Sequence, residues 1–123
     1  MAKKVKKAGD EELLDIVVKG MQELKATNIV VMDLRELESA MTDYFVIASG
    51  NSSTHVEAIA NSVERFTEEN MDESPRRVEG KRNAKWVLMD YFTVIVHVFD
   101  EETREFYSLE QLWGDAKFKY IED

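Results

Sequence analysis

The sequence predicts an α+β domain with α/β-type layers, in which helices flank a mixed sheet of about five strands. Three observations lead to this fold class. Segments with helical spacing alternate with short runs rich in β-branched and aromatic residues. The chain of 123 residues is 44% hydrophobic, which is enough for one core and not for two. No repeat or flexible linker divides it, so we expect one domain over residues 10–114, a basic flexible tail at 1–9 and a loosely held tail at 115–123.

The N-terminal part of the domain predicts a helix followed by a strand. Between residues 10 and 26, apolar side chains recur at the helical spacing, and Asp10 is a suitable N-cap. Residues 28–34 instead alternate with a period of two and are rich in β-branched side chains, which indicates a strand. Residues 36–41 form a link.

A buried strand, a tight turn and a second helix follow. Residues 43–49 are almost continuously hydrophobic, which is typical of a strand near the centre of a sheet. Gly50 ends this strand. Thr54 and Glu57 then form a capping box for a helix that runs to about residue 70.

The second half of the chain predicts three strands and a short helix. Residues 76–79 carry charged side chains next to a proline, as edge strands often do. Residues 86–89 and 94–99 predict an antiparallel hairpin whose turn is 90–93. A capping box at Ser108 predicts a short helix, after which no further strand is expected.

Composition limits the classes of function. The chain has 25 acidic and 16 basic residues, and its formal net charge of -9 repels nucleic-acid phosphates and anionic lipids. The acidic body suits a basic protein surface. Absence of cysteine excludes disulfides and thiolate chemistry, and no apolar run is long enough to span a bilayer. We expect a cytoplasmic protein that binds neither DNA nor membranes directly.

One candidate ligand site is the turn Gly50–Ser53, where backbone N–H groups at a helix N-terminus would hold an anion. The turn lacks the lysine of a P-loop. Nucleotidyl transfer also needs paired carboxylates for magnesium, and the nearby strands offer only Asp90. An ordinary strand-to-helix turn is the alternative interpretation.

The two histidines, His55 and His97, have no histidine partner at a ligand spacing, so no metal site is predicted. His97 shares a strand face with Ile95 and Phe99. We interpret it as a structural, hydrogen-bonded side chain, with a catalytic role as the alternative. No catalytic residue and no cofactor are predicted.

Aromatic residues concentrate near the C-terminus, where both tryptophans and three of the four tyrosines follow Glu79. Hairpin turns favour glycine and asparagine, so a turn containing Tyr91 and Phe92 is unusual. Exposed aromatics beside an acid are typical of protein-binding hot spots, whereas core packing is the alternative. We therefore predict a partner-binding surface formed by Trp86, Asp90, Tyr91 and Phe99.

The chain resembles the ribosomal silencing factor family, also called Iojap-like, over about residues 10–114. The resemblance rests on several short motifs that are highly specific together: Asp43–Gly50, Ser52-Ser53, His55-Val56, Glu79-Gly80, Trp86–Asp90, Val94–Phe99, Glu102, Arg104, Tyr107, Leu109-Glu110 and Leu112-Trp113. Family members commonly have a glycine and then an acid at the hairpin turn, where this chain has Phe92 and Thr93.

The resemblance implies a nonenzymatic factor with a fold related to nucleotidyltransferases but without their catalytic carboxylates. Such a factor binds the large ribosomal subunit through its fourteenth protein and sterically blocks joining of the small subunit when nutrients are limiting. Organellar relatives serve in ribosome biogenesis. Three alternatives stay open: a nucleotide-binding or nucleotidyltransferase-like enzyme using Gly50–Ser53, a ribosome biogenesis adaptor, and a homodimeric adaptor.

Overall fold

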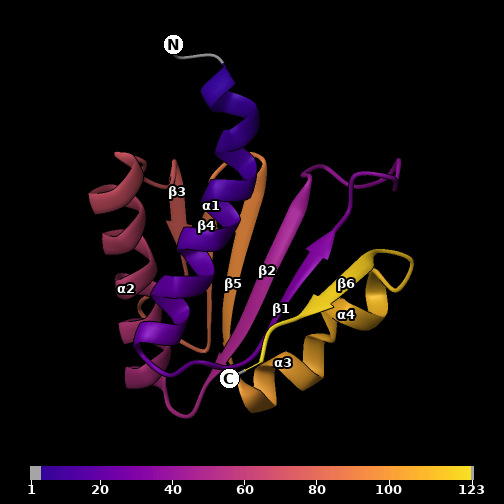
Figure 1. Ribbon diagram of the computed structural model, residues 1–123. Helices are drawn as coiled ribbons and strands as arrows, with labels where there is room; N and C mark the ends of the chain where they lie inside the picture. The colour runs from indigo at the N-terminus through magenta and orange to yellow at the C-terminus, as the bar shows by residue number, and fades with distance from the viewer. Residues whose placement is uncertain (1–3, 123) are drawn as a thin grey trace.

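The computed structural model describes the backbone of residues 4–122 and the side chains of residues 9–122. Its strands form one six-stranded sheet in the order β3-β4-β5-β2-β1-β6 (Figure 1). The elements follow along the chain as α1 (Lys4–Glu23), β1 (Thr27–Asp33), β2 (Tyr44–Gly50), α2 (Ser53–Met71), β3 (Arg77–Glu79), β4 (Trp86–Asp90), β5 (Val94–Asp100), α3 (Glu101–Tyr107), α4 (Leu109–Leu112) and β6 (Lys117–Tyr120).

The α+β class and the mixed sheet are confirmed. β2 and β5 pair in parallel at the centre of the sheet, and the neighbouring pairs β1–β2 and β4–β5 are antiparallel. Six of the seven residues of β2 are buried, as its continuous hydrophobicity predicts. The hairpin of β4 and β5 also forms as predicted.

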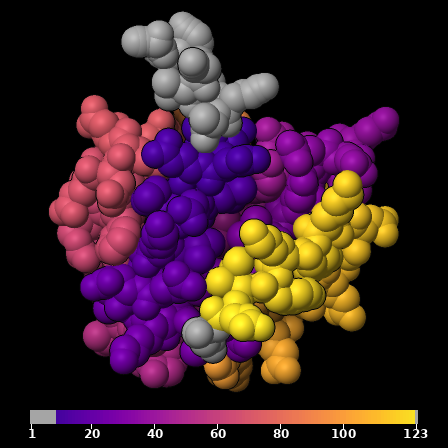
Figure 2. All heavy atoms as spheres, in the orientation of Figure 1, coloured from indigo at the N-terminus to yellow at the C-terminus, as the bar shows by residue number. Residues whose placement is uncertain are grey.

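One face of the sheet packs against α1 and α2, which lie side by side over it (Figures 1 and 2). Val17 and Met21 of α1 and Ile59 of α2 contribute fully buried side chains to this core. The two helices approach closely at Gly20, where an added Cβ would lie 2.9 Å from the Cα of Val63. α1 and α2 thus form one layer that covers this face.

The opposite face is covered only in part, by α3, α4 and the segment 113–116 that leads to β6. A second, smaller core lies there, which includes Ile47, Phe99 and Leu109. Because strand residues alternate between faces, the odd-numbered residues of β5 point to this side and the even-numbered ones point to α1 and α2.

Two expectations about the ends of the domain are corrected. α1 begins at Lys4 and not at Asp10, so part of the predicted basic tail is helical; residues 1–3 of that tail, and residue 123, lie outside the described residues. Within the predicted loose tail, β6 pairs antiparallel with β1, which gives six strands in place of five. α3 was not predicted either, and none of its residues is buried.

The start of α2 is also corrected. Its N-cap is Ser52, whose Oγ accepts a hydrogen bond of 3.1 Å from the backbone N–H of His55. The predicted cap, Thr54, already lies inside the helix. No helix in the described part of the chain combines the length and apolar character that crossing a membrane requires.

The turn between β4 and β5 is tight. The backbone N–H of Thr93 donates to the carbonyl of Tyr91 at 3.0 Å, and Phe92 between them has a φ of 76°. These features define a classic γ-turn, a conformation that is strained for a bulky side chain. Phe92 thus adopts backbone angles that favour glycine.

Candidate partner-binding surface

The four residues predicted to bind a partner do not form one exposed patch. Phe99, Asp90 and Tyr91 are buried, with relative exposures of 0%, 3% and 5%, whereas Trp86 is half-buried. Trp86, Asp90 and Phe99 share the face opposite α1 and α2, but Tyr91 belongs to the core under these helices. The expectation that all four are exposed is therefore corrected for Asp90, Tyr91 and Phe99, and Trp86 is the one whose side chain is partly accessible.

Asp90 anchors the γ-turn. One of its carboxylate oxygens, Oδ1, accepts a 2.8 Å hydrogen bond from the backbone N–H of Phe92. The other, Oδ2, accepts from Nε of Arg76 at 3.1 Å and lies 3.7 Å from the guanidinium of Arg77. The guanidinium of Arg76 also stacks over the Phe92 ring at 3.8 Å from its centroid. These contacts stabilise the strained turn and leave the carboxylate inaccessible.

Tyr91 connects the hairpin to α2. Its hydroxyl forms a buried hydrogen bond of 2.9 Å with Oγ1 of Thr67. Burial raises the pKa of Tyr91 to about 12, because the phenolate would lose its hydration in the core. The one large aromatic of the turn that is exposed is Phe92, at 63%.

Trp86 lies at the centre of an aromatic cluster. Its indole stacks on Phe99 with a centroid distance of 4.9 Å and contacts Tyr107 of α3 at 4.7 Å. Its Nε1–H donates to Nδ1 of His97 at 3.0 Å. These contacts fix the orientation of the indole. Because Trp86 is only half-buried, part of the ring remains accessible.

Around Trp86, α3 and α4 leave part of the sheet uncovered. We call this region the open sheet face and define it by five half-buried apolar residues from β2, β4, β5 and the end of α4: Phe45, Trp86, Leu88, Ile95 and Trp113. The Phe45 and Trp113 rings meet edge to face at 6.1 Å. Sequence reasoning found only Trp86 of this set.

More exposed apolar side chains continue from the open sheet face onto the two short helices. Tyr107, which contacts Trp86, is 49% exposed, and its ring neighbour Phe106 is 78% exposed. Leu112 of α4 is 71% exposed. The exposed charged residues of α3 include Glu101 and Glu105, which also line a pocket that contains Arg104. Contiguous exposed apolar patches are characteristic of protein-binding surfaces.

His97 lies beneath the open sheet face and is 3% exposed. Its ring meets Phe45 edge to face at 4.6 Å, in addition to the bond with Trp86. Burial lowers the pKa of His97 to about 3, so the imidazole is neutral at physiological pH. Its Nε2 is buried and has no hydrogen-bond partner among the described residues.

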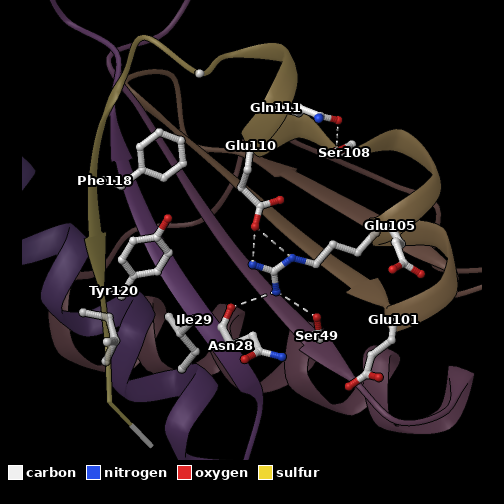
Figure 3. Close-up of a pocket in the computed structure, with 13 residues that line it drawn as sticks. Asn28, Ile29, Ser49, Glu101, Glu105, Ser108, Glu110, Gln111, Phe118 and Tyr120 are labelled. Atoms are coloured by element: carbon white, nitrogen blue, oxygen red, sulfur yellow. Dashed lines mark hydrogen bonds and ion pairs between the residues drawn. The ribbon is translucent and has the colours of Figure 1, made fainter.

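A pocket of about 790 Å³ lies beside α3, and Arg104 is among its lining residues. Figure 3 shows Asn28, Ser49 and Glu110 in the lining of this pocket. The Arg104 guanidinium donates to Glu110 at 2.7 Å, and to the Asn28 carbonyl and the Ser49 hydroxyl at 2.8 Å each. With its donors used in this way, Arg104 holds α3 and α4 against β1 and β2. Glu101 also lines the pocket, and its negative charge would repel a bound phosphate.

The Gly50–Ser53 turn uses part of its hydrogen-bonding capacity within the chain. The N–H of Asn51 donates to Nδ1 of His55 at 2.9 Å, and Ser52 accepts from the N–H groups of His55 and Val56. Gly50 pairs with the end of β5, whereas Asp90 pairs five residues earlier, about 17 Å away along the strand. The turn and the carboxylate that a nucleotidyltransferase would combine are thus far apart. Among the described residues, no three acidic or histidine side chains gather as a metal site would require.

Comparisons with known proteins agree on one family. Residues 7–123 match the model of a family described as "Ribosomal silencing factor during starvation". A "Ribosomal silencing factor RsfS" of Halalkalibacterium halodurans is 39% identical over 87% of this chain and 90% of its own length. A mouse protein named "Mitochondrial assembly of ribosomal large subunit protein 1" is 33% identical over 85% of this chain and 46% of its own length. A crystal structure of a protein from Chromobacterium violaceum covers 92% of each chain with a TM-score of 0.80 and 28% identity.

Proposed function

Since the chain belongs to the ribosomal silencing factor family, we propose that it binds the large ribosomal subunit through the fourteenth protein of that subunit and sterically blocks joining of the small subunit. Translation would then be repressed when nutrients are limiting. The observation that carries this proposal is an aromatic surface around Trp86 that is left partly open by the elements of the described residues.

The open sheet face has the anatomy of a docking site. Its accessible residues are apolar and contiguous, and they rest on a rigid sheet and not on a mobile loop. The aromatic contacts of Trp86 hold the indole in place before binding, which reduces the entropy that the complex must lose. Tyr107 and Phe106 extend the apolar area toward α3.

The charge of the molecule favours a basic partner. The net charge is -9, and α3, the helix that carries Tyr107 of the aromatic surface, also exposes Glu101, Glu102 and Glu105. Proteins of the ribosome must neutralise RNA phosphates and are therefore commonly basic. Opposite charges would increase the association rate, while the desolvated aromatic centre would supply most of the affinity.

Co-sedimentation with purified large subunits tests the surface. We expect Trp86→Ala to weaken binding by about 2 kcal/mol or more, which is at least about 30-fold, because an anchor of an interface is lost. Ile95→Lys, which places a charge on the same face, gives a second variant. The matched control is Phe66→Ala, a half-buried aromatic of α2 on the other side of the sheet. Parent-like binding of both face variants in folded form would exclude this surface.

A role in assembly of the large subunit is a second candidate, favoured by the name of the mouse relative. The same surface would serve both roles. Depleting the protein from growing cells and separating the subunits by sedimentation distinguishes them: accumulation of incomplete large particles supports assembly, and a normal profile supports silencing alone.

A further inference from the structure

The imidazole of His97 is in one defined tautomer. The indole of Trp86 can only donate a hydrogen bond. Nδ1 of His97, which accepts this bond at 3.0 Å, must therefore carry a lone pair and no proton. In the neutral ring, the proton is then on Nε2. This Nε2–H is a buried donor, and no acceptor for it lies among the described residues.

A buried donor without an acceptor is uncommon in folded proteins, because its lost hydration is not replaced. The bond with Trp86 uses only the acceptor Nδ1 of the ring. His97 sits in β5 between Leu88 of β4 and Ile47 of β2, whose apolar side chains offer no acceptor to Nε2. The position of His97 beneath the open sheet face suggests that its Nε2–H finds an acceptor when a partner binds there.

Two half-buried aromatic side chains pack against His97 on the side of the open sheet face. Phe45 contacts the ring edge to face at 4.6 Å, and Trp86 contacts it from β4. Both belong to the open sheet face. A rotation of the Phe45 side chain, which interface side chains commonly undergo on binding, would expose Nε2 to a docked partner.

We propose that the Nε2–H of His97 donates a hydrogen bond to a carbonyl oxygen of the polypeptide that docks on the open sheet face. This inference rests on the proposed function and adds a polar specificity contact at the centre of the apolar surface. The apolar surroundings favour a neutral acceptor over a carboxylate, whose charge would be costly to bury. Partners without a correctly placed acceptor would leave the donor unsatisfied and bind less well.

Two substitutions separate the two nitrogens of the ring. His97→Asn places an amide oxygen near the Nδ1 position, where it can accept from Trp86, but it lacks a donor at Nε2. His97→Gln places an amide N–H near Nε2 and does not retain the acceptor for Trp86. Binding of each folded variant to purified large subunits is measured by co-sedimentation, with circular dichroism to establish the fold.

We expect His97→Asn to weaken binding at least tenfold and His97→Gln to bind within about threefold of the parent protein. Parent-like binding of His97→Asn would overturn the inference, and so would an equal loss in both variants, which indicates a purely structural role. If Trp86→Ala abolishes binding and His97→Asn does not, this inference fails while the proposed surface stands. If Trp86→Ala and Ile95→Lys both bind normally, the proposed surface itself fails.

Discussion

Burial of His97 makes the stability of the domain dependent on pH, and this dependence can be isolated with one variant. The pKa of His97 falls from 6.5 to about 3 because burial penalises the charged imidazolium. Between these values the unfolded chain binds a proton that the folded protein does not. The contribution of the neutral His97 is therefore fully present above about pH 6.5 and is lost as the pH falls toward 3.

The size of the effect follows from the linkage between protonation and folding. Within that pH window, each unit of pH changes the free energy of unfolding by up to about 1.4 kcal/mol. From pH 7 to pH 5, the expected loss due to His97 is about 2 kcal/mol, most of it below pH 6.5.

Urea unfolding of the parent protein and of His97→Asn at pH 7 and pH 5 gives the measurement. The variant can be less stable at both pH values, but it lacks the titrating group. Its loss of unfolding free energy between pH 7 and pH 5 should be smaller than that of the parent by about 2 kcal/mol. All other ionisable groups are the same in both proteins, so their contributions cancel in this comparison. An equal pH dependence of the two proteins would refute a neutral, buried His97.

Two further predictions concern contacts that hold the elements together. Tyr91→Phe removes the hydroxyl that bonds to Thr67, and should lower the free energy of unfolding by about 1 kcal/mol without changing ribosome binding; weaker binding would show that Tyr91 contacts the partner after all. Arg104→Met removes the group that joins Glu110, Asn28 and Ser49, and since its side chain is 12% exposed, we expect a loss of about 2 to 3 kcal/mol in thermal or urea unfolding. An unchanged unfolding free energy would contradict a connecting role for Arg104.

Strong periodic signals made much of the fold predictable. The continuous hydrophobicity of residues 43–49 indicated the central strand β2, and the spacing of residues 86–99 indicated the hairpin. β6 could not be found in this way, since its four residues alternate lysine with aromatics and only Phe118 is partly buried. α3 buries no residue, so it carries no apolar stripe that a helical period would reveal.

The candidate site was less predictable, because alternation along a strand does not show which face is covered. Trp86 and Phe99 are paired on the same face, yet one is half-buried and the other fully buried. The difference arises from α3 and α4, which pack over one end of the sheet only. Phe45 completes the surface through the parallel pairing of β2 with β5, which places it beside Ile95, 50 residues later in the chain. Local sequence patterns do not contain such a long-range contact.

Local sequence patterns also did not show that Asp90 and Tyr91 are buried. An acid and two aromatics in a hairpin turn predicted an exposed hot spot, but the γ-turn directs Tyr91 into the core and Phe92 outward. Asp90 satisfies the turn backbone and pairs with Arg76, a residue that no local motif connects with it.

Subunit joining tests the central claim most directly. Separated ribosomal subunits are mixed with the protein at a saturating concentration, and the amount of joined ribosome is measured by gradient sedimentation. The same experiment is done with Trp86→Ala. The account predicts that the parent protein migrates with the large subunit and reduces joining, and that the variant leaves joining at the level without protein. Undiminished joining by large subunits that demonstrably carry the parent protein would contradict silencing.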